Sequence, residues 1–265
     1  MKSMYHLNQI PSEAQIKKYL RHIVFGKNMF CPGCRSQKVV KYEYRYRCRA
    51  CRAKFSLLSH TWLGDMKLPY EKFWMVLWSW TTQIPVKQAQ ALTGLSEEAV
   101  RRWYDRFRCH LPEDHVILEK IVQLDEAYFK NWSLVMGKQP GTKKLAYTMM
   151  RGSVQRHHAA IFVEQHVKPR SHLNTDGALI YKTIDQWWPV VHKRDIHAKW
   201  EFGRTSEIEG TFGNLRTFIR RMYHHSTPEK LPDYVREFCA RFSLPEMFEN
   251  PKYYLKKTLS LVPID

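Results

Sequence analysis

Two Cys-x-x-Cys pairs lie close together near the start of this 265-residue sequence. The first pair is Cys31 and Cys34, the second is Cys48 and Cys51, and thirteen residues separate them. Each pair suits a tight turn whose thiolates point the same way, and four such sulfurs make the tetrahedral shell that Zn²⁺ favours. The spacing predicts a zinc ribbon in which the metal is structural; the alternative is cysteines that are close by coincidence. Cys109 and Cys239 stand alone and are expected to be small buried residues.

The charge of the chain is strongly positive, with a formal net charge of +18 at pH 7 and a pI of about 9.7. Residues 1–60 contain thirteen Lys or Arg against two acids. A chain this basic favours a polyanionic partner, and nucleic acid is the usual one, although a ribosome-bound or membrane-surface protein is the alternative. No run of about eighteen apolar residues predicts a membrane span. The first residues lack the apolar core of a signal peptide, so metal binding or free thiols are expected rather than disulfides.

The expected ribbon carries a rim of cations with tyrosines between them. This mixture suits contacts to a phosphate backbone. The cations are Lys38, Lys41, Arg45, Arg47, Arg49, Arg52 and Lys54.

The pattern of apolar residues changes along the chain, and this change predicts how the domains are divided. Residues 1–60 are expected to form a first helix and the ribbon, residues 61–114 a helical region, residues 115–248 an α/β domain and residues 249–265 a tail. The first helix should begin after a capping box at Ser12 and end at Gly26. Strand-like runs cover 121–129, 145–150 and 159–164, and helices are expected at 177–187, 206–223 and 231–242. Strands followed by helices predict an α/β layer.

Residues 86–108 resemble a helix-turn-helix, with the segment after Ser96 as the recognition helix. Ser96 is a good helix start because its oxygen can accept from a free backbone N–H group. On this interpretation Arg101, Arg102, Arg106 and Arg108 line the polar side and contact DNA. An ordinary helical hairpin with a solvated basic face is the alternative.

Three carboxylates stand out in the second half. Asp125 lies inside an apolar strand, where a carboxylate is costly unless it is paired or binds a metal. Glu126 alternates to the opposite face and is expected to have a structural partner. Asp176 comes before Gly177 at an expected strand end, although such a sequence is also a common turn.

The third carboxylate, Glu209, lies near the start of a helix with a buried apolar stripe. Arg216 follows two turns later, on a neighbouring face shared with Arg220. An acid and a cation placed in this way suit a site that binds a metal and a phosphate.

The order of these motifs resembles the DDE transposases of the ISXO and Merlin type, over about residues 12–242. The resemblance rests on the cysteine ribbon, the helical region, the Asp125-Glu126-Ala127-Tyr128 strand, the Thr175-Asp176-Gly177 turn and the Ile208-Glu209-Gly210 helix. It implies an RNase H-like catalytic domain in which Asp125, Asp176 and Glu209 are the catalytic triad and bind Mg²⁺ or Mn²⁺. It also implies that Arg216 is the basic residue seven positions after the Glu. Glu207 is the rival for the third acid.

The same resemblance implies that the protein binds double-stranded DNA at terminal inverted repeats and at a target, as a homo-oligomer. It implies no membrane association, and a cytoplasmic, nucleoid-associated location if the source is a prokaryote. Relatives carry a helix between the third strand and the second Asp, and residues 153–174 look short for it. A non-catalytic protein derived from a transposase and a different RNase H-like nuclease are the rival functions.

Overall fold

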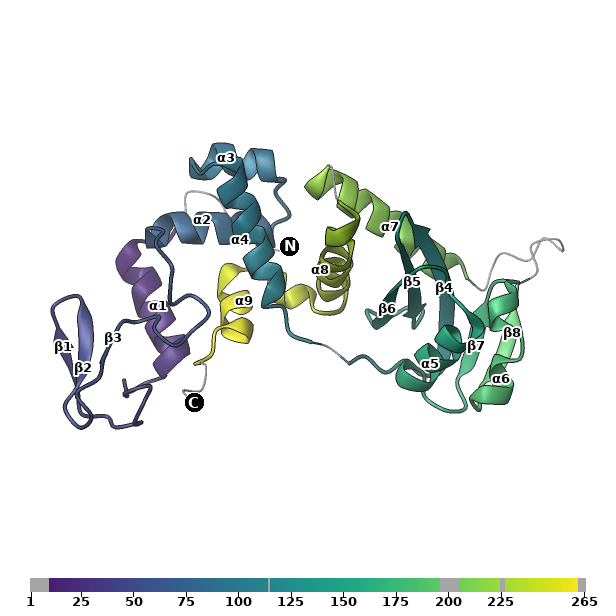
Figure 1. Ribbon diagram of the computed structural model, residues 1–265, viewed down its shortest axis with the longest axis horizontal. Helices are drawn as coiled ribbons and strands as arrows, with labels where there is room; N and C mark the ends of the chain where they lie inside the picture. Colours follow the sequence, from purple (N-terminus) through teal and green to yellow (C-terminus); the bar gives the residue numbers. More distant parts are fainter. Residues whose placement is uncertain (1–9, 114, 196–204, 225–226, 262–265) are drawn as a thin grey trace. The chain divides into compact units, whose positions relative to one another are not determined.

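The computed structural model describes residues 10–113, 115–195, 205–224 and 227–261. The chain divides into two compact units (Figure 1). The first unit is drawn from the residues up to Pro112 and from Glu246 onward, and the second runs from Glu113 to Pro245. The chain therefore leaves the first unit and later returns to it.

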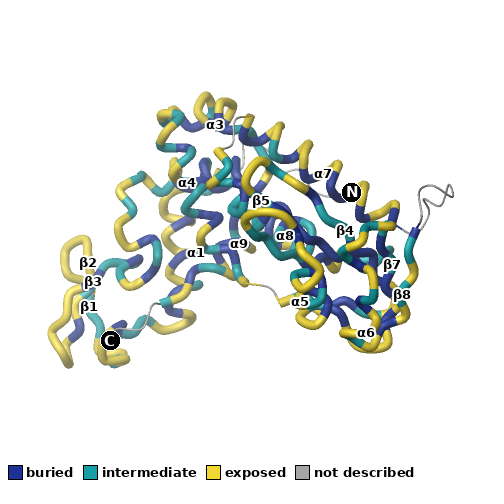
Figure 2. The backbone as a smooth tube through the Cα atoms, turned by 45° about the vertical axis from the view of Figure 1, so that its right-hand side comes forward, coloured by how far each residue is buried: buried dark blue, intermediate teal, exposed yellow. Residues whose placement is uncertain are grey.

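The first unit joins a small sheet to a set of helices. Strands β1, β2 and β3 form an antiparallel sheet in that order, with Tyr42 opposite Arg45 at the hairpin turn. Much of the tube of this hairpin has the colour of exposed residues, whereas the helices alternate buried and exposed positions (Figure 2). The elements are α1 (Glu13–Phe25), β1 (Val39–Tyr42), β2 (Arg45–Cys48), β3 (Lys54–Phe55), α2 (Tyr70–Thr81), α3 (Val86–Thr93), α4 (Glu97–Cys109) and α9 (Pro251–Thr258).

Local signals set the helix ends in this unit, as predicted. Ser12 and Gln15 form the capping box of α1, and Gly26 follows its last residue. The turn between α3 and α4 passes through Gly94, whose φ of 65° lies in the left-handed region that glycine adopts without steric cost. The Ser96 hydroxyl then accepts from the Ala99 N–H at 3.1 Å and starts α4.

Aromatic side chains form the core of the helical part. Trp80, Phe107 and Tyr254 are fully buried, and the ring centroids of Trp80 and Tyr254 are 5.1 Å apart. Since Tyr254 comes from α9, the returning segment supplies part of this core.

The second unit is built on a mixed sheet. Its described strands form a five-stranded sheet in the order β6-β5-β4-β7-β8, in which β4, β5 and β6 are antiparallel and β7 and β8 are parallel to β4. This topology confirms the predicted RNase H-like class. The elements are β4 (Ile121–Phe129), β5 (Trp132–Lys138), β6 (Leu145–Arg151), α5 (Arg156–His166), β7 (His172–Thr175), α6 (Ile184–Trp187), β8 (Val191–Arg194), α7 (Ser206–Tyr223) and α8 (Leu231–Ser243).

Helices cover both faces of this sheet. On one face Val122, Leu124 and Val135 pack with α5 and α6 in a single core. A Cβ at Gly137 would come within 2.8 Å of Leu118 and 3.0 Å of Phe162, so the glycine allows this close approach. On the other face α7 packs on β4 and β5, and α8 packs on β6.

Three element predictions are corrected here. Residues 159–164 were expected as a strand, but they lie in helix α5, because Ala159, Phe162 and Val163 fall at helical spacing and are buried. Helix α5 thus lies within residues 153–174, the interval that looked too short for a helix. Strand β5 was not predicted, since burial at nearly every position leaves no alternation to detect. The helix expected at 177–187 is a 3₁₀ turn (Leu179–Tyr181) followed by the four-residue α6.

The other two helix predictions for this unit agree closely with α7 and α8. Within the part of the chain that the structure describes, no helix is both long and apolar enough to cross a membrane.

Candidate active site and metal centre

The four ribbon cysteines converge on one point. Their sulfur atoms lie within 4.8 Å of one another, and the Sγ–Sγ distances of Cys31 to Cys51 and of Cys34 to Cys48 are both 3.6 Å. Sulfurs bound tetrahedrally to zinc at about 2.3 Å would lie about 3.8 Å apart, so the four thiols fit this ion. The backbone N–H group of Cys51 donates to Cys48 and lowers the pKa of the Cys48 thiol, whereas the neighbouring thiols raise the pKa of Cys51. A bound cation would remove this repulsion between the sulfurs.

The remaining two cysteines differ in burial. Cys239 is buried as expected, whereas Cys109 is exposed at the last position of α4, so its predicted burial was wrong.

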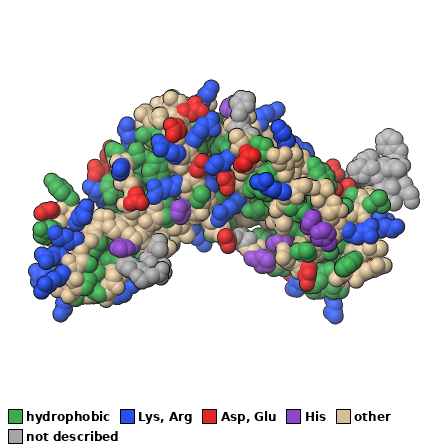
Figure 3. Space-filling view, in the orientation of Figure 1, with side chains coloured by type: hydrophobic (Ala, Val, Ile, Leu, Met, Phe, Trp, Pro, Cys, Tyr) green, Lys and Arg blue, Asp and Glu red, His purple; other side chains and the backbone are tan. Residues whose placement is uncertain are grey.

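The basic rim of the ribbon is exposed. Figure 3 shows Lys and Arg side chains gathered over the end of the molecule that carries the β1–β2 hairpin. Tyr42 lies under two of them, with Lys54 Nζ 4.6 Å and the Arg47 guanidinium 5.9 Å from its ring centre. The exposed cations are Lys38, Lys41, Arg45, Arg47, Arg49, Arg52 and Lys54.

The arginines of α4 have different surroundings. Arg101 and Arg102 pair with Glu97 and Glu98 one turn earlier, at 2.6 and 3.8 Å. Arg106 donates to the Trp62 carbonyl and lies over the Trp62 and Trp103 rings. Arg108 was predicted on the polar side, but it is 3% exposed and pairs with Asp105, because it follows the buried Phe107 and Tyr104 face.

The two aspartates meet where the pairing of β4 with β7 ends. Strand β7 pairs with β4 only as far as Leu124 and Thr175, so Asp125 and Asp176 follow directly where the pairing ends. Asp176 Oδ1 accepts from the Ala178 N–H at 3.0 Å, and Asp125 Oδ1 accepts from the Glu126 N–H at 2.8 Å. One carboxylate oxygen from each aspartate and one from Glu126 lie within 4.8 Å of one another. The parallel pairing of β4 with β7 therefore joins two acids that are far apart in sequence.

The environment of Asp125 disfavours its charge. Burial raises the pKa of Asp125 to about 7, and the charges of Glu126, Asp176 and Glu209 act in the same direction. A cation bound between these groups would remove the repulsion, and hard carboxylate oxygens are the ligands that Mg²⁺ prefers. Oxygens on opposite sides of one Mg²⁺ lie about 4.2 Å apart, so the observed spacing fits with a small adjustment.

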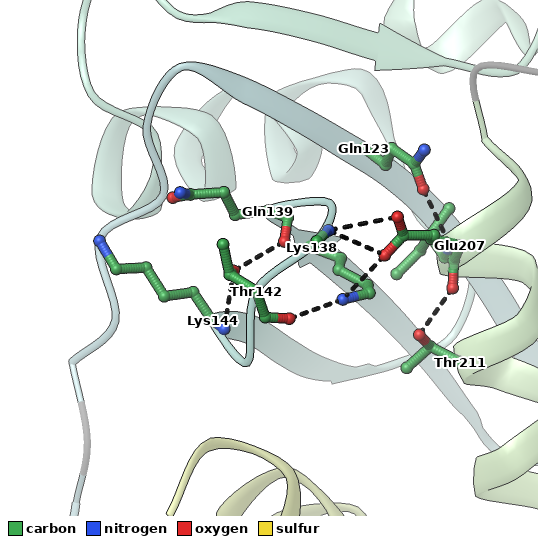
Figure 4. Close-up of polar contacts among 9 residues, drawn as sticks. Gln123, Lys138, Gln139, Thr142, Lys144, Glu207 and Thr211 are labelled. Carbon is green, nitrogen blue, oxygen red and sulfur yellow. Dashed lines mark hydrogen bonds and ion pairs between the residues drawn. The ribbon is translucent and has the colours of Figure 1, made fainter.

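Glu207 and Glu209 point to different partners. Glu207 accepts from the Gly141 N–H and pairs with Lys138 Nζ, each at 3.2 Å (Figure 4). Glu209 accepts from the Thr205 hydroxyl at 2.8 Å and contributes to the electrostatic field at Asp125. Glu207 therefore anchors the helix, while Glu209 is the acid of α7 whose charge is felt at Asp125.

A buried glutamine ties the start of α7 to the aspartate strand. Gln123 Oε1, two residues before Asp125 on β4, accepts from the Ile208 N–H at 2.9 Å. This contact satisfies one of the free N–H groups at the helix start. Sequence patterns did not indicate Gln123 or Lys138 as supporting residues, because their partners are 85 and 69 positions away.

The two cations of α7 that the sequence indicated as phosphate contacts, Arg216 and Arg220, are exposed on its surface. Arg216 and Arg220 lie on the same helix as Glu209, at the expected two-turn and three-turn spacing. Both are therefore accessible to a phosphate that approaches the helix.

Comparisons with known proteins agree with this arrangement. A family model described as a transposase zinc-ribbon domain matches residues 11–54, which contain the four cysteines. A second model, described as an ISXO2-like transposase domain, matches residues 130–243, which contain Asp176, Glu209 and Arg216 but begin after Asp125. An uncharacterized protein in transposable element ISH50 from Halobacterium salinarum is 22% identical, over 97% of this chain and 98% of its own length.

Proposed function

We propose that this chain, which matches the ISXO2-like transposase and transposase zinc-ribbon models, binds the terminal inverted repeats of an insertion element and cleaves and joins DNA strands with divalent metal ions. The observation that carries the proposal is the meeting of Asp125 and Asp176 where the pairing of β4 with β7 ends. In this proposal these carboxylates and Glu209 of α7 would together bind the metal ions that act on a phosphodiester.

In the proposed site Asp125, Asp176 and Glu209 would hold the divalent ions. The ions, Mg²⁺ or Mn²⁺, would activate water or a 3′-hydroxyl and stabilise the leaving oxygen. Gln123 and Glu207 fix the start of α7, and so hold Glu209 in register with β4. Arg216 orients a phosphate near the cleaved end.

DNA is bound in this proposal by the basic rim of the ribbon and by α4. The seven rim cations are exposed, and Glu43 at the hairpin turn is the one acid in the sequence from Lys38 to Lys54. On α4, Arg101 and Arg102 would exchange their glutamate partners for phosphates or bases, whereas Arg106 would hold the helix against Trp62. Bringing two element ends together implies a multimer on DNA.

The triad is tested by Asp125→Asn, Asp176→Asn and Glu209→Gln. Each should abolish nicking of a terminal-repeat duplex, because each removes a negative charge that holds the metal while keeping the volume of the side chain. Binding of the duplex should stay near the wild-type level, since it depends on remote cations. Arg216→Ala should slow cleavage only in part. Gel assays of nicking and binding measure both properties.

The matched control is Glu164→Gln, an exposed carboxylate on α5 of the same unit. Glu207→Gln should lower stability and slow cleavage a few-fold, without abolishing it. Loss of cleavage in Glu207→Gln with normal cleavage in Glu209→Gln would reassign the third acid. A wild type that binds the repeats but never nicks them would identify a non-catalytic relative of the transposases, and nicking without strand joining would favour a nuclease.

Binding through the rim is tested by its salt dependence. The logarithm of the affinity should fall with the logarithm of salt concentration by about 0.9 for each phosphate contact. Arg47→Ala should therefore reduce the slope by about one contact. Arg156→Ala, an exposed cation on α5, should leave the slope unchanged. Equal slopes for the wild type and a variant with Lys41, Arg45 and Arg47 all changed to Ala would exclude the ribbon from the interface.

A further inference from the structure

Glu126 reaches the aspartates although its strand position faces away from them. Its side chain projects toward Tyr181, which belongs to the core on the α5 face, as the alternation along β4 predicts. Even so, one of its carboxylate oxygens lies within 4.8 Å of oxygens of Asp125 and Asp176. This is possible because β7 stops pairing with β4 at Leu124, so no strand separates the two faces of the sheet at this edge.

A buried tyrosine holds the Glu126 carboxylate in place. The hydroxyl of Tyr181, a fully buried residue, donates to Glu126 Oε2. This hydrogen bond leaves other lone pairs of the carboxylate, which can accept about four contacts. Carboxylates that ligate metals are commonly oriented by hydrogen bonds of this kind.

Glu209 differs from Glu126 in its distance from the aspartates and in its exposure. Within the described part of the chain, the carboxylates that meet at ligand spacing are those of Asp125, Glu126 and Asp176, and Glu209 is outside this group. Glu209 is exposed and accepts from Thr205. Thus Glu126, rather than Glu209 of α7, supplies the third carboxylate oxygen at this spacing from the two aspartates.

We propose that Glu126 is a third protein ligand of the divalent ion held by Asp125 and Asp176, and that Tyr181 is a positioning residue for it. This inference rests on the proposed function, because it concerns the same metal site. Glu126 would supply an oxygen to that ion before DNA arrives, and Tyr181 would restrict the carboxylate to the orientation that faces the two aspartates.

The experiment measures Mn²⁺ binding to the full-length protein without DNA, from the loss of the free-ion signal in electron paramagnetic resonance. Glu126→Gln should weaken Mn²⁺ binding at least 10-fold, because the amide keeps the phenol contact but loses the charge. Tyr181→Phe should weaken it by about 10-fold or somewhat more, as loss of an orienting partner does at other metal sites. Glu164→Gln on α5 should match the wild type, and Asp125→Asn should bind no Mn²⁺.

Each outcome separates the two proposals. If Asp125→Asn loses Mn²⁺ while Glu126→Gln binds it like the wild type, Glu126 is only the hydrogen-bond partner of Tyr181 and the inference is wrong. If Glu126→Gln does not fold, Tyr181→Phe decides, since a purely structural phenol would lower the melting temperature without changing Mn²⁺ affinity. A folded wild type that binds no Mn²⁺ at millimolar concentration would overturn the metal site and this inference together.

Discussion

The ribbon cysteines and the sheet carboxylates are both sets of metal ligands, but the chain assembles them in different ways. The four cysteines lie within 21 consecutive residues and are brought together by two turns and a hairpin. The carboxylates come from β4, from the end of β7 and from α7, and a parallel strand pairing brings the first two together. We expect the first site to depend on its metal for local structure, whereas the second lies beside a hydrophobic core that contains none of its ligands.

The most direct test of this contrast is a substitution of Cys48. Cys48→Ser should lose the bound zinc and unfold the ribbon, because structural zinc contributes about 10 kcal/mol or more to folding in modules of this size. The second unit should keep its structure, since its core contains no ribbon residue. Metal analysis and proteolysis of the two units measure these effects, with the exposed Cys109→Ser as the control. A wild type that is folded and free of zinc would end the distinction between the sites.

The carboxylate site should behave in the opposite manner, with stability gained when a ligand is removed. The pKa of Asp125 is raised from 3.8 to about 7, so the folded state holds this proton more tightly than the unfolded state does. The resulting stabilisation is complete below about pH 4 and is lost as pH rises through about 7. Asp125→Asn should therefore stabilise the protein in magnesium-free buffer at pH 8 by up to about 4 kcal/mol, and have little effect at pH 4.

Thermal unfolding of the second unit at both pH values checks this prediction. Saturating Mg²⁺ should reverse the order at pH 8 by stabilising the wild type alone. An Asp125→Asn protein less stable than the wild type at pH 8 without Mg²⁺ would show that the carboxylate is a structural partner.

The smallest expected effect concerns how the second site is supported. Gln123→Leu should lower the free energy of unfolding by about 1–2 kcal/mol, because it leaves the buried Ile208 N–H without its acceptor. Cleavage should slow by about 10-fold, since the start of α7 then positions Glu209 less well. Gln139→Leu is the matched control, because Gln139 Oε1 accepts from the backbone N–H of Glu119 at 3.1 Å, away from α7. Equal losses of cleavage in the two variants would remove the positioning role.

The two sites also differ in how far the sequence predicts them. Spacing alone identified the four cysteines, since their geometry follows from nearby turns. From the sequence, Asp125 and Asp176 were separate candidates, and only the order of the motifs placed them in one site. The register of β4 with β7 then shows how they come together. Glu126 was interpreted as a neighbour with a structural partner, which Tyr181 is, but its approach to the aspartates depends on where β7 stops pairing. The residue at which two strands stop pairing is a feature of the tertiary structure, and neither periodicity nor composition predicts it.

Helix α9 has a consequence for the order in which the protein matures. The hydroxyl of the fully buried Tyr254 donates to the Phe107 carbonyl at 2.8 Å, and the Trp62 indole donates to the Thr258 carbonyl at 3.1 Å. During synthesis, all of the second unit leaves the ribosome before these contacts can form. The sheet that carries the carboxylates can thus fold while the helical core of the first unit is still open. A chain terminated before residue 251 would keep the carboxylates of the second unit, but its first unit would lack part of its core. We therefore expect an early stop to impair DNA binding rather than the carboxylate site.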